Sequence, residues 1–177
     1  MIYTVGHSTR SLETFLALLA EHQIQLLVDV RRYPASRRYP YFAQEPLAAA
    51  LGAAGIDYRH DADLGGRRSA RKDSPNTGWR SVGFRGYADH RETLAFEHAL
   101  ICLTTAAPQP IAIMCAEAVP WRCHRQLIAD ALIARGSAVR HILGAGDVRD
   151  HRLSPHAQVL AGGLIRYPAP PDEPALW

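Results

Sequence analysis

Thiol, carboxylate, imidazole and guanidinium groups crowd into one short segment of the chain. Residues 115–125 read Cys-Ala-Glu-Ala-Val-Pro-Trp-Arg-Cys-His-Arg and lie between an apolar stretch and a helical pattern. Nearby positive charge and a helix N-terminus both favour the thiolate form of a cysteine, which is the nucleophilic form. We therefore take Cys115 as the candidate nucleophile. The candidate site in this segment comprises Cys115, Glu117, Cys123, His124 and Arg125.

Each of these groups also has a structural interpretation. Cys115 ends an apolar stretch and can be an inert core thiol, a common state of buried cysteine. Glu117 can act as a general acid or base, or it can form an ion pair with Arg122 or Arg125. His124 can enter the site or pack as a hydrogen-bonded ring. The sequence leaves these alternatives open.

Further polar groups follow two earlier apolar stretches. His7 and Ser8 come after the first stretch, and His7 can be a general base, a phosphate contact or a ring bonded to loop backbone. Asp29 stands just before Arg31 and Arg32. We interpret Asp29 as the residue that orients these arginines, with a catalytic carboxylate as the alternative.

Arginines alternate with aromatic rings after Asp29. Residues 31–91 carry twelve Arg or Lys against six Asp or Glu, and only Lys72 is lysine. Guanidinium groups bind phosphate bidentately while rings stack on bases, so the expected partner is a phosphate-bearing small molecule or a nucleic acid. A solvated loop is the alternative. The candidate catalytic residues are Cys115, Glu117, His124, His7 and Asp29, and the candidate substrate-binding residues are Arg31, Arg32, Arg37, Arg125, Ser8 and Tyr87.

Cysteine and histidine can also bind a metal ion. Zinc sites usually draw paired ligands at short spacing, whereas seven residues separate Cys115 from Cys123 and no second pair follows. The glycines at 65–66 and 144–146 lack the strand-to-helix setting of a dinucleotide fingerprint. The sequence therefore predicts neither a metal nor another cofactor.

The elements that must position these residues alternate along the chain. Strands are expected over residues 1–5, 24–30, 56–59, 111–115 and 139–143, and helices over 12–21, 47–54, 87–105 and 122–135, with a long loop over 61–83. This alternation predicts a three-layer α/β fold, with a mainly parallel sheet and helices on both faces. Ligands of such sheets bind beyond the carboxyl ends of the strands, so the groups above should converge there.

Length and composition indicate a single α/β domain over residues 1–177, with a loose proline-rich tail from about residue 168. No stretch reaches the roughly 20 apolar residues that a membrane span needs, and the first residues lack a secretory pattern. Three cysteines indicate free thiols in a reducing compartment, with Cys102 in the core. A Cys115–Cys123 pair is the alternative. The expected location is the cytoplasm.

Several spaced segments together resemble the Domain of Unknown Function 488 family. They are Thr-Val-Gly-His-Ser (4–8), Leu-Val-Asp-Val-Arg (27–31), Pro-Ala-Ser-Arg (34–37), Leu-Gly-Gly (64–66), Gly-Phe-Arg-Gly-Tyr-Ala-Asp (83–89), Cys-Ala-Glu (115–117), Cys-His-Arg (123–125) and His-Ile (141–142). The resemblance covers about residues 2–145 and implies no activity or catalytic residues. His90 and Arg91 depart from the family pattern, which matters little if they are surface positions.

A fainter similarity is to rhodanese and Cys-dependent phosphatase domains. Their loops hold five residues between cysteine and arginine, whereas six separate Cys115 from Arg122. The leading hypothesis is an enzyme, a Cys-dependent hydrolase or transferase that acts on a phosphate-bearing substrate. The alternatives are a non-catalytic nucleotide or nucleic-acid binding module and a thiol redox or metal-binding protein.

Overall fold

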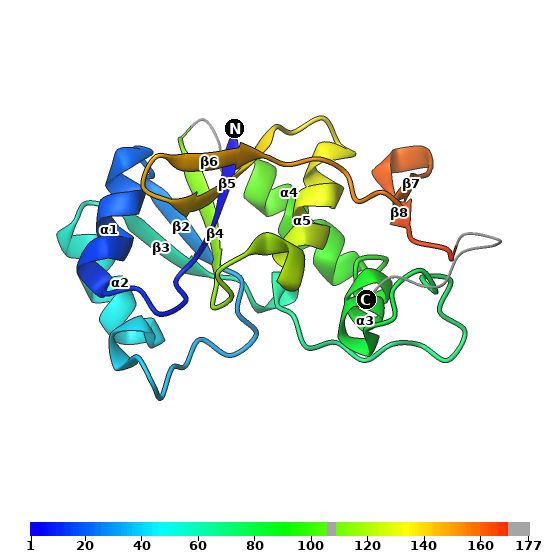
Figure 1. The fold of residues 1–177 in the computed structure, drawn as a ribbon, viewed down its shortest axis with the longest axis horizontal. Coiled ribbons are helices and arrows are strands. Elements are labelled where there is room, and N and C mark those ends of the chain that lie inside the picture. Colours follow the sequence, from blue (N-terminus) through cyan, green and yellow to red (C-terminus); the bar gives the residue numbers. More distant parts are fainter. Residues whose placement is uncertain (106–108, 170–177) are drawn as a thin grey trace.

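A six-stranded sheet forms the centre of the molecule in the computed structural model, which describes residues 1–105 and 109–169. The strand order is β3-β2-β4-β1-β5-β6, with all neighbours parallel except β5 and β6 (Figure 1). The strands are β1 (Ile2–Gly6), β2 (Leu26–Asp29), β3 (Asp57–His60), β4 (Ile111–Cys115), β5 (Val139–Gly144) and β6 (Asp147–Asp150).

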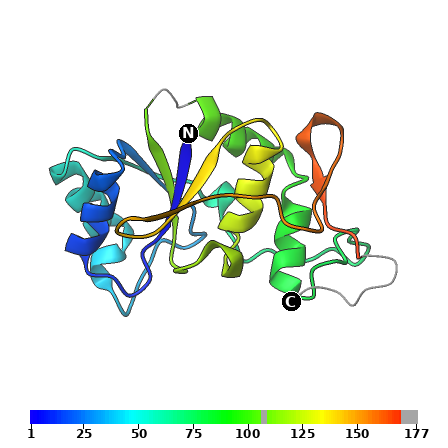
Figure 2. The same ribbon diagram turned by 45° about the horizontal axis from the view of Figure 1, so that its top comes forward.

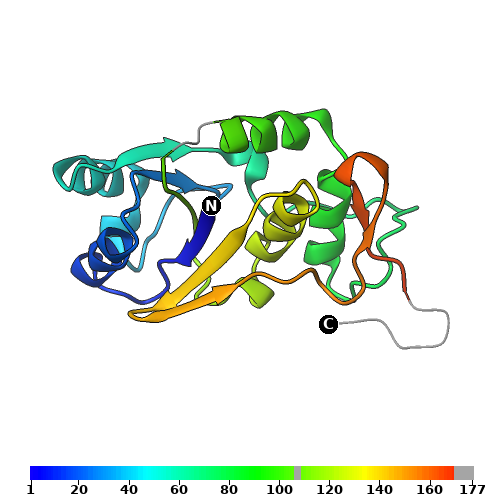
Figure 3. The ribbon, with the colours of Figure 1, turned by 90° about the horizontal axis from the view of Figure 1, so that it is seen from above.

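Five helices cover the two faces of this sheet. They are α1 (Leu12–Glu21), α2 (Gln44–Ala53), α3 (Val82–His90), α4 (Leu94–Thr105) and α5 (Arg125–Ile133). Figure 3 shows α1 and α2 on one side of the strands and α3, α4 and α5 on the other. The α/β fold with a mainly parallel sheet and helices on both faces is thus confirmed.

Strand β4 shows how the sequence builds two cores. All five of its residues are buried, as expected for a parallel strand between two helical layers. Ile111, Ile113 and Cys115 join the cluster under α4 and α5, while Ala112 and Met114 join the cluster under α1 and α2. This period of two fixes the direction of Cys115, which ends the strand.

The helix expected over residues 87–105 is in fact two helices. The Thr93 side chain accepts from the amide of Phe96 and caps α4, and Arg91 between the helices turns inward. Arg91 is only 4% exposed and donates to the Tyr167 hydroxyl and to the Ile165 carbonyl, so it is not a surface position. The apolar pattern of the sequence continues across this break, so it does not show that one helix ends and a second begins.

The segment 61–83 is more ordered than the loop that its composition indicates. It contains the short 3₁₀ helix η2 (Ala62–Leu64), and α3 begins at Val82. The buried Asp89 carboxylate accepts from the Arg71 amide, the Ser74 hydroxyl and the Asn76 side-chain amide. One carboxylate of α3 therefore holds much of the segment in place.

Two further expectations, the start of the last helix and the place of Cys102, need correction, and a third concerns residues that the structure mostly does not describe. Helix α5 starts at Arg125, because the 3₁₀ helix η3 (Pro120–Arg122) precedes it. Cys102 is half-buried, 3.9 Å from His98 Nε2, rather than in the core. The expected loose tail from about residue 168 lies mostly outside the described residues.

A small hairpin follows β6 and packs beside α3. It consists of β7 (Gln158–Val159) and β8 (Ile165–Arg166), joined by the 3₁₀ helix η4 (Ala161–Gly163), and Figure 2 shows it next to α3. The Gly78 amide donates to the Tyr167 carbonyl just after β8. None of the helices in residues 1–105 and 109–169 is long and apolar enough to cross a membrane.

Candidate functional site

A cavity of about 560 Å³ opens beyond the carboxyl ends of β2 and β4. Its wall combines the segment after β2, the turn after η2 and the segment from β4 to α5. The lining residues with reactive or charged side chains are Arg31, Arg32, Arg37, Arg67, Cys115, Glu117, Arg122, Cys123 and His124. The cavity lies where the predicted parallel sheet places a ligand site.

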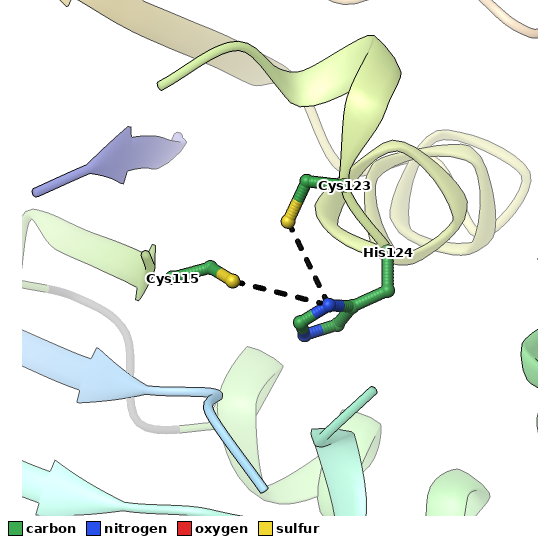
Figure 4. A group of neighbouring side chains, drawn as sticks. All are labelled: Cys115, Cys123 and His124. Carbon is green, nitrogen blue, oxygen red and sulfur yellow. Dashed lines mark hydrogen bonds between the residues drawn. The ribbon is translucent and has the colours of Figure 1, made fainter. Parts of the chain in front are cut away.

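Two thiols and one imidazole meet in the wall of this cavity (Figure 4). His124 Nδ1 lies 3.6 Å from Cys123 Sγ and 3.9 Å from Cys115 Sγ. His124 Nε2 lies 2.9 Å from the Val30 carbonyl oxygen, which can only accept, so Nε2 carries the proton. The lone pair of Nδ1 therefore faces both sulfurs. We call Cys115, Cys123 and His124 the thiol–imidazole cluster.

A glycine turn holds the His124 ring in this position. A Cβ atom at Gly66 would lie 2.8 Å from His124 Nδ1, so only glycine allows the approach. The Tyr87 hydroxyl donates to the Leu64 carbonyl at 2.6 Å, and the Tyr87 ring lies 5.0 Å from the His124 ring. Tyr87 is buried and outside the cavity lining, so it supports the turn from behind.

Arg125 lies behind the cluster and is fully buried. Its guanidinium donates to Thr4 Oγ1 at 3.2 Å and to the main-chain carbonyl of Glu117. Among the residues that the structure describes, no carboxylate forms an ion pair with Arg125. A buried cation without such a partner favours a nearby anion, and the thiol of Cys123 can become one.

A buried hydrogen-bonded chain continues from Arg125 to Asp130. Thr4 Oγ1 lies 2.7 Å from His141 Nδ1, His141 Nε2 lies 2.9 Å from His151 Nδ1, and His151 Nε2 lies 2.8 Å from Asp130. Burial and the nearby charges of His151 and Arg125 lower the pKa of His141 to about 3, which keeps its ring neutral.

The two thiols of the cluster differ in acidity. Burial raises the pKa of Cys123, but hydrogen bonds from Cys115 and Arg125 and the Arg125 charge outweigh it and lower that pKa to about 6. Donation to Cys123 and burial raise the pKa of Cys115 to about 12. The arrangement therefore favours a Cys123 thiolate that accepts a hydrogen bond from the Cys115 thiol.

The predicted groups after β1 and β2 form a second buried set beside the cavity. The Asp29 carboxylate accepts from the side chain and the amide of Arg31, and so fixes that guanidinium. His7 Nδ1 contacts the Ser8 carbonyl, while Nε2 lies 3.5 Å from Arg31. Burial and the charge of Arg31 lower the pKa of His7 to about 4, so the ring is neutral near pH 7.

The structure brings some of the predicted site residues into the cavity and leaves others outside its lining. Cys115, Glu117, His124, Arg31, Arg32 and Arg37 line it. His7, Asp29, Arg125, Ser8 and Tyr87 do not. Glu117 is exposed and forms no ion pair with Arg122 or Arg125 among the described residues, because Arg125 contacts its backbone carbonyl instead.

Sequence reasoning did not count the lining arginines Arg67 and Arg122 as binding residues, and it placed Cys123 in the site without a catalytic role. Arg67 follows the glycine turn with a left-handed φ of 58°, a conformation that costs a non-glycine residue energy and often marks a functional position. Arg122 was considered as an ion-pair partner of Glu117 and, by its spacing from Cys115, as the arginine of a phosphatase-like loop. The Leu-Gly-Gly segment directly before Arg67 was the one available signal.

A model of the family described as Domain of unknown function DUF488 matches residues 11–132 of the chain. The chain belongs to the DUF488 family. This confirms the resemblance that the spaced segments indicated. No curated protein and no solved structure matches the chain. The DUF488 match includes the whole cavity lining, whereas Thr4, His7, His141 and His151 lie outside the matched residues.

The thiol acidities of this DUF488 protein predict an unusual alkylation profile. In chelator-treated protein, the rate of Cys123 modification by iodoacetamide should rise with pH through a midpoint near 6 and then level off, because only the thiolate reacts. Peptide mapping by mass spectrometry measures this rate at pH values from about 4 to about 9, a range that includes the usual thiol pKa of about 8.5. Cys102→Ser serves as the control and should leave the profile unchanged. A midpoint near the usual thiol value would contradict the prediction.

Proposed function

We propose that this protein is an enzyme that binds a phosphate-bearing substrate in the cavity and acts on it with the thiol–imidazole cluster. Its reaction class would be that of a Cys-dependent hydrolase or transferase. The observation that carries the proposal is the lining itself: five arginines and a single carboxylate, Glu117, surround a cavity that reaches two thiols and an imidazole. The arginines are Arg31, Arg32, Arg37, Arg67 and Arg122.

The arginines suit a phosphate group in both charge and availability. Among the described residues, Arg32, Arg37, Arg67 and Arg122 form no ion pair with a carboxylate, so their guanidinium groups are available for a ligand. Arg31 is held rigidly by Asp29 at 2.5 Å. Guanidinium forks bind phosphate oxygens bidentately, and one fixed fork among several adaptable ones gives both orientation and reach.

The size and edge of the cavity fit a nucleotide better than a bare phosphate. A volume of about 560 Å³ falls within the usual range for small-molecule sites. Tyr33 lines the cavity and is 62% exposed, and the Arg32 guanidinium lies 5.9 Å from the centre of its ring. An exposed ring beside a cation is the kind of group on which a base of a nucleotide stacks. We therefore expect nucleotides or nucleic-acid ends among the substrates.

The same exposed ring supports a second candidate function, a binding module without catalysis. Both functions predict salt-sensitive binding of phosphate-bearing ligands, since the arginines release counterions in either case. They differ in the role of Cys123. Cys123→Ser should abolish turnover if the protein is an enzyme, and should leave affinity for the same nucleotide unchanged if it is a binding module.

Arg67→Gly tests the phosphate site with two opposed readouts. The affinity for inorganic pyrophosphate should fall about tenfold, which corresponds to loss of about 1.4 kcal/mol from one guanidinium contact. The free energy of unfolding should rise by about 1 kcal/mol, because glycine adopts the left-handed conformation without strain. Isothermal titration calorimetry and urea denaturation measure the two changes.

Arg149→Ala is the matched control for this experiment. Arg149 is an exposed arginine paired with Asp147 at the far edge of the sheet, on β6, and should not affect pyrophosphate affinity. Equal pyrophosphate affinity in wild type and Arg67→Gly, or binding that does not weaken as salt is raised, would contradict a phosphate site in this cavity.

A further inference from the structure

We propose that the thiol–imidazole cluster binds a thiophilic divalent metal ion, with Zn²⁺ as the best match, through Cys115 Sγ, Cys123 Sγ and His124 Nδ1. One coordination position would face the cavity. The metal site itself stands on the geometry of these three residues, and its part in catalysis rests on the proposed function.

The spacing of the three donor atoms fits tetrahedral coordination. The two sulfurs and Nδ1 all lie within 4.8 Å of one another, and the sulfur–nitrogen distances are 3.6 Å and 3.9 Å. Zinc bonds of about 2.3 Å to sulfur and about 2.0 Å to nitrogen place tetrahedral sulfur and nitrogen ligands about 3.6 Å apart. The cluster therefore needs only a small contraction to close on an ion.

The imidazole of His124 is prepared as a ligand. Its Nε2–H donates to the Val30 carbonyl at 2.9 Å, which leaves the Nδ1 lone pair directed at the sulfurs (Figure 4). Metal-bound histidines usually make this kind of second hydrogen bond, because it fixes the tautomer and the ring orientation. The Nδ1 lone pair faces two sulfur atoms, and one ion between them would bind the nitrogen and both sulfurs.

The charges around the cluster select a soft metal rather than a hard one. Two thiolates neutralise a divalent ion, and a metal ion displaces the thiol protons when it binds. The arginines of the cavity repel cations, and a hard cation such as Mg²⁺ prefers oxygen ligands, which the cluster does not offer. Thiolate and imidazole ligands prefer zinc-like ions, so the strength of these bonds can overcome the surrounding positive charge.

The open position would connect the metal to the proposed substrate. All three ligands line the cavity that the arginines surround, so an anion held by Arg32 or Arg67 would lie on the same side as the fourth position. An ion with three protein ligands and one open position is the arrangement of catalytic zinc, which polarises bound oxygen. A structural zinc would have four protein ligands instead.

Metal reconstitution with Co²⁺ and Zn²⁺ tests the site. Reduced, chelator-treated full-length protein should take up one ion per chain, and the Co²⁺ form should show thiolate-to-metal charge-transfer absorption. Cys115→Ser, Cys123→Ser and His124→Ala should each weaken binding about 100-fold or more, since each removes a ligand. Cys102→Ser is the matched control and should bind as the wild type does. Circular dichroism checks that each variant is folded.

Several outcomes would overturn the metal site. These are no stoichiometric uptake by the reduced wild type, uptake that persists in Cys123→Ser, and uptake that disappears in Cys102→Ser. A Cys115–Cys123 disulfide that forms in air, in protein with no metal affinity when reduced, would overturn it in favour of a redox pair. Pyrophosphate affinity of chelator-treated protein separates the two proposals: its presence without metal uptake rejects only the metal, and its absence with metal uptake rejects only the phosphate site.

Discussion

Replacing Arg125 with methionine should lower the free energy of unfolding by about 1.5–3 kcal/mol, the usual contribution of hydrogen bonds made by a charged group. The guanidinium is fully buried, and its loss removes the donors to Thr4 Oγ1 and to the Glu117 carbonyl. The carbonyl, in a partly buried contact, would then lose its charged donor. Urea denaturation of both proteins at pH 7.5, a value set above the usual histidine pKa of about 6.5, measures the difference.

The same substitution should change the chemistry of the cluster. Arg125 lowers the pKa of Cys123, so its removal should shift the alkylation midpoint of Cys123 upward from about 6. Arg149→Met is the control for a long arginine on the surface and should change stability by less than about 0.5 kcal/mol. An Arg125→Met protein within about 1 kcal/mol of wild type would show that the buried chain carries little stability.

The second large effect is a loss of stability in mild acid. The folded protein holds His7 and His141 neutral, with pKa values of about 4 and about 3, whereas both side chains protonate near pH 6.5 when unfolded. Below pH 6.5 the unfolded chain therefore binds more protons, and stability falls with pH toward the folded values. At about 1.4 kcal/mol per pKa unit, and allowing for partial solvent screening, the two rings should cost about 2–4 kcal/mol between about pH 7.5 and pH 5.

Urea denaturation at these two pH values measures the loss. His141→Gln should reduce the difference by about half, because glutamine has no proton to gain, although the variant loses some stability at both pH values. His156→Gln is the control: His156 is not part of the buried hydrogen-bonded chain, so this variant should lose as much stability in acid as the wild type does. Equal losses in wild type and His141→Gln would rule out His141 as a source of the acid sensitivity.

Local patterns predicted the elements of the fold well where one rule acted alone. The apolar run of β4 and the helical pattern of α1 both agree with the structure: β4 spans Ile111–Cys115, and α1 spans Leu12–Glu21, as expected. Parallel strand ends share one edge of a sheet, so the convergence of Arg31 and Cys115 on one cavity also followed from the sequence. Errors arose where tertiary contacts decided the outcome, as at the buried Arg91.

The finer chemistry of the site could not be predicted, because it depends on contacts between distant residues. Whether Cys115 or Cys123 is the more acidic thiol depends on the side of the cluster on which Arg125 lies. The chain from Thr4 through His141 joins residues 137 positions apart, and nothing in the local sequence marks it. Arg67 lies in a charged segment without an apolar period, and nothing in that segment indicates its left-handed backbone conformation.

The central place of β4 and β1 in the sheet decides when the strands can pair during synthesis of the chain. Both neighbours of β1 come later in the chain, since Ile2 pairs with Ile111 on β4 and with Val139 on β5. Of the parallel pairs, only β2 with β3 can form before residue 111 emerges from the ribosome. Such distant pairings are slow to form, so folding waits for nearly the whole chain. Cys115 and Cys123 therefore come together with the arginines of the cavity only late in folding. A chain released early would not contain a partly assembled reactive site.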